Sequence, residues 1–382
     1  MGTEQSKARF KKKNDSQKRE LQEINKAIKI NEYLKPFNWA YVHPYLFGWE
    51  VELLKKMSEE GTGSMEAIFR IFTRSFYDLK TTASFIEGFF KKRKSLAPFA
   101  LLIDQAVVLA LQKEYAGAIN LLIPVIEGSM RHYLTVVQGQ NSAALTKSSQ
   151  LLKVFDCVAQ DYVTMHREAL EAEEADCHPL IRLDTNQFKQ VIANEQAYIT
   201  QWLSIAKEYL ANNLYLDTRT GLVADKLNRH AIVHGFTTDI YYSLENFLRL
   251  YHLLFFLSWA YGIADKTASP FVVAEEEVIC RKWAALEKIR VLTTLADEAK
   301  LSIYTTYPDF DKSAYLQTLP LSKVSQVIDS TPALFVEQRV RFIDQTLQPT
   351  TSPIAVSKAG RVMRLVVAKV TKLLVRRGTA RV

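Results

Sequence analysis

The sequence contains few of the residues that interrupt helices. Among its 382 residues there are 13 glycines and 11 prolines, whereas leucine, alanine, lysine, glutamate and glutamine are abundant. Glycine and proline cost a helix more than any other residue does, and the abundant residues are mostly good helix formers. The composition therefore predicts an all-α protein, and the length is enough for two or three domains.

Cysteine is also scarce. The chain has three cysteines, an odd number, and no pair of them has the Cys-x-x-Cys spacing. Such usage argues against a disulfide framework and indicates a reducing compartment. The N-terminal residues lead straight into lysines, without the apolar core of a signal peptide. We therefore expect a cytoplasmic protein.

Long hydrophobic runs are missing. The most apolar stretch, Leu250 to Ala264, is 15 residues long and includes His252. A membrane-spanning helix needs about 20 apolar residues. We therefore expect this stretch to be the buried central helix of a bundle, and not a membrane span.

The motifs of cofactor and metal chemistry are missing as well. The segment Gly61-Thr62-Gly63 lacks the lysine of a phosphate-binding loop, and there is no dinucleotide fingerprint and no Ser–His–Asp signal. His230 and His234 have a spacing that can bind zinc, but the sequence offers no His-Glu-x-x-His pattern and no obvious third ligand. We expect neither a cofactor nor a metal.

Acidic residues are absent from Gln345 to Val382, although the net charge of the whole chain is only +8. A basic amphipathic helix is predicted at 355–377. It would bind RNA phosphates or lie on an anionic membrane or partner surface, and a solvated helix face is the alternative without a function. Its candidate nucleic-acid-binding residues are Arg361, Arg364, Lys369, Lys372, Arg376 and Arg377.

Composition and hydrophobic periodicity divide the chain into four regions. The first twenty residues are polar and basic, which predicts disorder, and a charge run at 91–94 followed by Pro98 marks the next boundary. The regions are a basic disordered tail (1–20), an N-terminal helical region (21–95), a central helical domain (96–264) and a C-terminal helical region with a basic tail (265–382). Helices are predicted at about 48–58, 64–93, 98–113, 114–138, 147–172, 184–212, 222–234, 244–263 and 274–300.

One short stretch, Leu227 to Gly235, concentrates residues with chemical function. It contains Arg229, four intervening residues and His234, with His230 directly after the arginine. An arginine binds phosphate oxygens and stabilises the charge that develops on them, and an imidazole transfers protons near neutral pH. These residues suit the cleavage of a phosphodiester without a metal.

The stretch resembles the signature of the HEPN superfamily, which consists of all-helical bundles with an arginine followed four to six residues later by a histidine. Its context is similar too, because a bacterial-type branch of that superfamily has a Glu-Gly-x-x-Arg segment on an earlier helix. The resemblance covers roughly residues 96–264. The matching positions are Asn228, Arg229, His230, His234 and Gly235, together with Glu127 and Arg131.

The resemblance implies a metal-independent endoribonuclease in which two protomers line one cleft and the ribose 2′-OH attacks its own phosphate. Arg229 would hold the phosphate, and His234 would act as general base or acid. His230 or Asn228 would hold the phosphate or orient water. Such domains are common in bacterial defence and toxin systems, so the expected partners are RNA, a second copy of the chain, and a regulatory protein or antitoxin.

Other interpretations remain open. On a regular helix, residues five apart lie about 140° apart around the axis, so Arg229 and His234 converge only in a frayed last turn or across a dimer. Asp225 with Arg229, and Glu127 with Arg131, have the spacing of ordinary salt bridges within one helix. The domain would then be a non-catalytic HEPN-like scaffold that binds RNA, a nucleotide or a protein. A peripheral membrane or interaction module driven by the basic ends is a further alternative.

Overall fold

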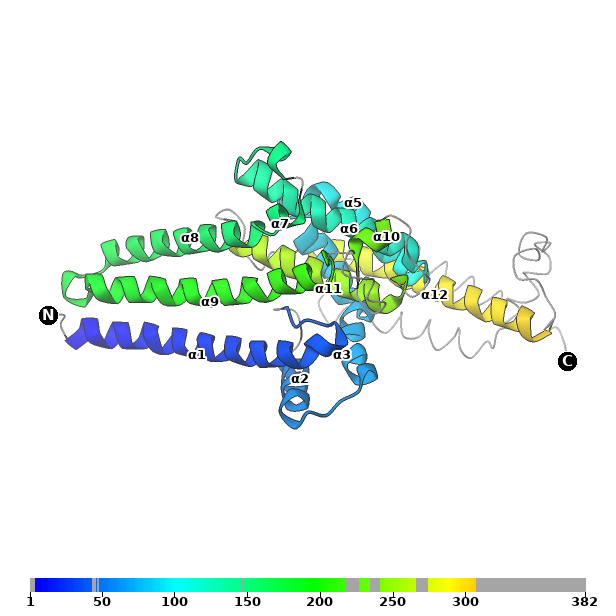
Figure 1. Ribbon diagram of the computed structural model, residues 1–382, viewed down its shortest axis with the longest axis horizontal. Helices are drawn as coiled ribbons and strands as arrows, with labels where there is room; N and C mark the ends of the chain where they lie inside the picture. Colours follow the sequence, from blue (N-terminus) through cyan, green and yellow to red (C-terminus); the bar gives the residue numbers. More distant parts are fainter. Residues whose placement is uncertain are drawn as a thin grey trace, which may run out of the picture. The chain divides into compact units, whose positions relative to one another are not determined.

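The computed structural model of the chain describes residues 4–42, 46, 48–145, 147–216, 227–233, 241–265 and 274–306. These residues are mostly helical and include no strand, which confirms the predicted all-α fold (Figure 1). The chain divides into two compact units, residues 1–279 and 280–382. The elements are α1 (Glu4–Leu34), η1 (Lys35–Phe37), α2 (Gly48–Glu60), α3 (Met65–Tyr77), α4 (Leu79–Ser84), η2 (Phe85–Phe90), η3 (Ala97–Phe99), α5 (Ala100–Leu111), α6 (Tyr115–His132), η4 (Tyr133–Val137), η5 (Ser142–Ala144), α7 (Ser148–Leu151), α8 (Val154–Asp176), η6 (Pro179–Ile181), α9 (Thr185–Asn212), α10 (Arg229–Val233), α11 (Leu244–Ile263) and α12 (Glu276–Thr306).

Helix α11 is the centre of the first unit. Its N-cap, Ser243, accepts a hydrogen bond from the backbone N–H of Asn246, and every residue from Asn246 to Gly262 is buried. The helix packs against α3, α6, α8, α9 and η2, as expected for the most apolar stretch of the chain. The prediction of a buried central helix is confirmed. Among the described residues, no helix is both long and apolar enough to cross a membrane.

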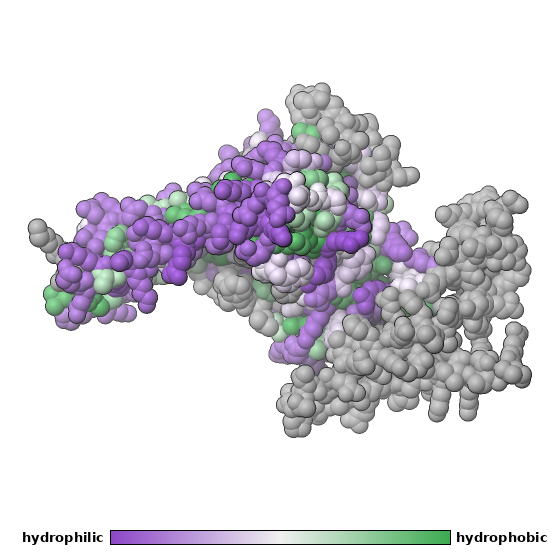
Figure 2. Space-filling model, turned by 90° about the horizontal axis from the view of Figure 1, so that it is seen from below, coloured by the Kyte–Doolittle hydropathy of each residue, from purple (hydrophilic) through white to green (hydrophobic). Residues whose placement is uncertain are grey.

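Helices α1, α8 and α9 lie side by side and form an arm of the first unit (Figure 1). On the face seen in Figure 2, the surface of this arm is mostly hydrophilic. Its interior contains a polar contact, because buried Glu195 of α9 accepts hydrogen bonds from Gln17 of α1 and from Tyr162 of α8, each at 3.0 Å. This contact explains why one glutamate interrupts the apolar face of α9.

The structure corrects the prediction that residues 1–20 are a disordered tail. Residues 4–34 form one helix that packs on α9. Two of the basic side chains are paired across the arm: Arg9 lies 2.7 Å from Glu173 and 2.6 Å from Glu174, and Lys13 lies 2.8 Å from Glu173. The prediction failed because it treated a basic stretch alone, whereas its acidic partners are about 160 residues away in the sequence.

Two other boundaries differ from the prediction. The helix expected at 64–93 is broken at Asp78, which ends α3 and caps α4 by accepting a hydrogen bond from the backbone N–H of Thr81; aspartate is a favoured cap. The expected border between residues 95 and 96 does not separate compact units, because α1 packs on α9 and α3 packs on α11. In contrast, α9 and α11 cover the residues predicted for them.

Candidate functional site

The start of the Arg229 stretch is fixed to the segment after α9 by one backbone hydrogen bond and by the side chain of Asn228. The N–H of Arg229 donates to the carbonyl of Leu214 at 2.9 Å. Asn228 is 2% exposed; its side chain donates to the carbonyl of Leu216 at 3.0 Å and accepts from the N–H of Ala231 at 3.1 Å. Asn228 therefore caps α10 from a buried position. The expectation that Asn228 holds a phosphate or orients water stays a prediction, and the structure adds this capping role to it.

The side chains of Arg229 and His230 in α10 lie at the surface. Ala231 and Ile232 are buried, whereas His230 is exposed and the Arg229 side chain is 39% exposed. Val233 is also half exposed. His234, the expected acid or base, lies outside the described residues, as do Gly235, Asp225 and the basic residues expected at 361–377.

Arg229 forms an ion pair with Glu127 of α6. The Nε atom of Arg229 lies 2.5 Å from Oε1 of Glu127, whose side chain is 15% exposed. These residues are about 100 positions apart in the sequence, so the contact is tertiary. Arg131, the alternative partner of Glu127, instead donates from Nη1 to the carbonyl of Leu145 at 2.5 Å. The structure thus joins the two segments on which the resemblance depends.

Burial dominates the electrostatics of this pair. It raises the pKa of Glu127, and the charges of Arg229 and Arg131 oppose that rise only in part. The loss of hydration therefore destabilises the Glu127 carboxylate by more than the nearby cations stabilise it. Removing Arg229 would leave the Glu127 carboxylate without its main compensating positive charge.

Tyr215, just beyond the end of α9, completes the cluster and was not predicted. Its hydroxyl lies against the Glu127 carboxylate, and burial together with that carboxylate raises the pKa of Tyr215 well above its ordinary value of 10. The phenol is therefore a neutral hydrogen-bond donor. Among the described residues, neither the Tyr215 hydroxyl nor the Arg229 Nε–H has a well-aligned hydrogen bond. A lone tyrosine past a helix end gives no sequence signal for such a role.

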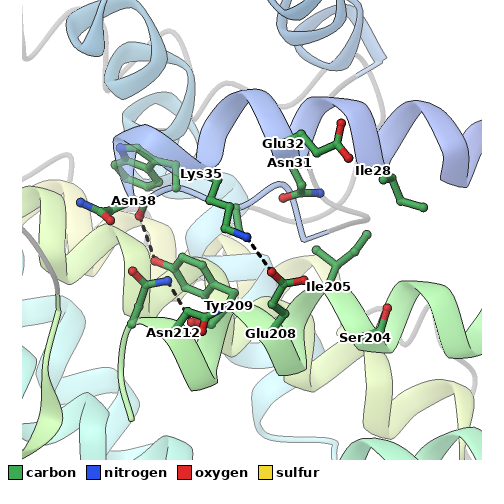
Figure 3. Close-up of a pocket in the computed structure, with 13 residues that line it drawn as sticks. Ile28, Asn31, Glu32, Lys35, Asn38, Ser204, Ile205, Glu208, Tyr209 and Asn212 are labelled. Atoms are coloured by element: carbon green, nitrogen blue, oxygen red, sulfur yellow. Dashed lines mark hydrogen bonds and ion pairs between the residues drawn. The ribbon is translucent and has the colours of Figure 1, made fainter. Parts of the chain in front are cut away.

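A cleft elsewhere in the first unit does not suit the same chemistry. It has a volume of about 310 Å³ and lies between the C-terminal ends of α1 and α9 (Figure 3). Across it, Lys35 Nζ lies 2.8 Å from Glu208 Oε1, and the Tyr209 hydroxyl donates to the Asn38 carbonyl at 3.2 Å. With Glu32 as the third charged residue, the lining has an excess of negative charge. Phosphate binding requires the opposite.

Comparison of the chain with family models, with curated proteins and with solved structures finds no match. The functional interpretation therefore depends on the residues themselves and on their contacts. Among the described residues, no group of three or more His, Cys, Asp or Glu side chains is placed to hold a metal ion. The cluster of Glu127, Tyr215 and Arg229 is the candidate site, and its chemistry is that of an anion-binding guanidinium fixed by a carboxylate.

Proposed function

We propose that the chain is a HEPN-like, metal-independent endoribonuclease. The observation that carries this proposal is the ion pair between Arg229 and Glu127. The two residues come from the two sequence segments that resemble the superfamily, and they meet at a partly exposed position of the first unit. A guanidinium has five N–H donors, so Arg229 retains donors for a phosphate while Glu127 holds it in place.

The proposed reaction is an internal transesterification of RNA. The 2′-oxygen forms a bond to phosphorus while the bond from phosphorus to the 5′-oxygen breaks, which leaves a 2′,3′-cyclic phosphate and a 5′-hydroxyl. His234 takes the proton of the 2′-OH or supplies the proton of the leaving oxygen. Arg229 stabilises the charge on the phosphate oxygens, and Tyr215 is a neutral donor to the Glu127 carboxylate that holds Arg229. DNA lacks the internal nucleophile and would not be cut.

The proposal includes a homodimer, because two copies of the stretch would supply both a proton acceptor and a proton donor to one phosphate. Val233, an apolar side chain that is half exposed beside the cluster, is compatible with such a contact. Action in the cytoplasm, in bacterial defence or as a toxin restrained by an antitoxin, is part of the same proposal and depends on the resemblance alone.

A non-catalytic scaffold is the second candidate, and one observation favours it. The Arg229 guanidinium is already paired with Glu127, and an ion pair between two helices also stabilises a fold. In that case the surface around α10 would bind RNA, a nucleotide or a protein without cleaving it.

Cleavage of labelled total RNA in the presence of EDTA distinguishes these functions. Wild-type protein should cut RNA and leave 2′,3′-cyclic phosphate ends, and His234→Ala and Arg229→Ala should each abolish cutting. Arg70→Ala is the matched control, because Arg70 is 75% exposed and pairs with Glu66 on its own helix. Normal RNA binding by the wild-type protein without any cutting would refute the enzyme and support the scaffold. Equal cutting by the wild type and both variants would place the activity elsewhere.

A further inference from the structure

The solvent side of the first half of α1 carries an excess of positive charge. Among residues 4–19, five cationic and two acidic side chains are exposed. The cations are Lys7, Lys11, Lys12, Lys18 and Arg19, and the acidic residues are Glu4 and Asp15. The other two cations of this stretch, Arg9 and Lys13, are paired with Glu173 of α8. The acidic end of α8 therefore neutralises one side of α1 and leaves its exposed side basic.

Three of the lysines, Lys7, Lys11 and Lys18, form one stripe along α1. At about 100° per residue, all three lie roughly 160–200° around the helix axis from Arg9. Since Arg9 is paired with α8, the stripe lies on the side of α1 opposite the acidic end of α8. Lys7 has a 3.4 Å contact with Glu4, but both side chains are more than half exposed, so this pair neutralises little of the charge. The stripe is about 16 Å long.

The helix beside the stripe adds no exposed acidic side chain to it. Helices α1 and α9 lie side by side (Figure 1), and Asn194 of α9 donates a hydrogen bond to the Asn14 side chain of α1 at 3.4 Å. From residue 185 to residue 206, α9 contains one acidic residue, Glu195, and it is buried. The stripe therefore borders a neutral surface that carries amides.

The acidic residues further along α1 also leave the stripe basic. Glu23 is paired with Lys26 at 2.6 Å. Glu32, in the cleft of Figure 3, is fourteen residues beyond Lys18, or about 21 Å along the axis. That distance exceeds the Debye length of about 10 Å at moderate salt. The positive charge therefore belongs to the half of α1 that is nearest the end of the arm.

The chemistry of this face fits a phosphate backbone better than a membrane. In the described helix α1, no large apolar side chain is exposed, and the arm surface seen in Figure 2 is mostly hydrophilic. A helix that lies on an anionic membrane buries an apolar face in it, whereas lysines alone suffice for nucleic-acid phosphates. Single-stranded nucleic acids are usually bound with aromatic side chains that stack on the bases, and no aromatic side chain of α1 is exposed.

We propose that the stripe of Lys7, Lys11 and Lys18 binds the phosphate backbone of double-stranded RNA, whatever its sequence. Contacts to phosphates position a nucleic acid without reading its bases. The stripe lies beside the start of α9, whereas Arg229 is hydrogen-bonded to Leu214, just after the end of that helix. The arm would thus hold a duplex part of an RNA at a distance from the candidate site. The choice of RNA rests on the proposed ribonuclease, whereas the binding of phosphates does not.

Fluorescence anisotropy of a labelled RNA duplex with the full chain tests the proposal. A duplex of about 20 base pairs is several times longer than the stripe. Its riboses carry 2′-O-methyl groups, which block the internal nucleophile, so that binding is measured whether or not the chain cleaves RNA. The triple variant Lys7→Gln, Lys11→Gln and Lys18→Gln should bind at least about tenfold more weakly at 0.1 M salt, and the slope of log affinity against log salt should fall by about 3. Lys11→Gln alone should lower that slope by about 1.

A second triple variant, Lys35→Gln, Lys56→Gln and Lys153→Gln, is the matched control. These lysines are also exposed, and the two variants lose the same number of charges. The control should therefore keep the salt slope of the wild type. Because all six side chains are exposed, both variants should keep the wild-type circular dichroism spectrum, and duplexes of two unrelated sequences should bind the wild type equally.

The proposal is overturned if the wild type does not bind the duplex, if the stripe variant and the control bind it equally, or if affinity depends strongly on sequence. Binding to phosphatidylserine vesicles that is lost in the stripe variant, while its duplex binding is unchanged, would assign the face to a membrane and overturn the proposal too. Duplex binding that depends on the stripe, in a protein that cuts no RNA, would support this inference and refute the ribonuclease. The two failures are therefore distinguishable.

Discussion

The two partners of the ion pair in the candidate site should differ sharply in their effect on stability. The surroundings raise the pKa of Glu127, so the free energy lost by dehydrating its carboxylate exceeds the free energy gained from the nearby cations. Replacing Glu127 with glutamine removes this unfavourable charge. The lost attraction to the 39% exposed Arg229 is worth about 1 kcal/mol after screening by solvent. Glu127→Gln should therefore change the free energy of unfolding by less than about 1 kcal/mol at pH 7.

Arg229→Gln should be more costly. It leaves the Glu127 carboxylate, 15% exposed, without its main cation. Removing one partner of a fully buried pair costs about 3–5 kcal/mol, and the partial exposure reduces this to about 2 kcal/mol. In the double variant the uncompensated charge is gone, so its stability should return to that of Glu127→Gln.

Urea unfolding followed by circular dichroism measures all three variants. The pH dependence gives a second test. A carboxyl whose pKa is raised in the folded state favours folding below its unfolded pKa, and that contribution is lost as the pH rises through the folded value. For Glu127 the loss begins near 4.5 and continues upward. The deficit of Arg229→Gln should thus shrink on acidification from pH 7 towards pH 5. The reasoning is refuted if Glu127→Gln destabilises as much as Arg229→Gln, or if the effects of the single variants simply add.

Three further substitutions test the packing and the buried polar groups. Gly262→Ala places a methyl group against the Arg93 guanidinium and should destabilise the fold by about 1–3 kcal/mol, measured by urea unfolding. Gln17→Ala removes a donor to buried Glu195 and should cost about 1–2 kcal/mol in the same assay. His252 is neutral in the fold, since burial lowers its pKa to about 4. Stability should therefore fall by up to about 3 kcal/mol as the pH drops from 6.5 to 4, and His252→Gln should flatten that part of the pH profile.

Each of these substitutions has a matched control in the chain. Gly48→Ala introduces a methyl group with no heavy atom within 4 Å and should not destabilise. Gln190, also a glutamine on the arm, donates a hydrogen bond to Asn194 at the surface, so Gln190→Ala should change stability by less than about 0.5 kcal/mol. His178 is exposed, so His178→Gln is the control for the loss of a histidine at the surface. Equal effects of a substitution and its control would contradict the role assigned to the buried residue.

The sequence predicts a helix well where the capping residue and the apolar pattern lie within that helix. Ser243 and Asp184 are strong caps, and α11 and α9 begin directly after them. It fails where the partner is distant. The basic residues of α1 suggest disorder until Glu173 and Glu174 of α8 are placed beside them. A short-range pattern contains no information about such partners.

The same distinction holds at the candidate site. Two separate motifs identify Glu127 and Arg229, but only the tertiary structure shows that they pair, and Arg131 turns to a backbone carbonyl instead. Asn228 has a structural role that the motif does not indicate. Its position next to the arginine suggests catalysis, although its amide is used by the cap of α10. Tyr215 has no motif, and only its contact with Glu127 brings it into the cluster.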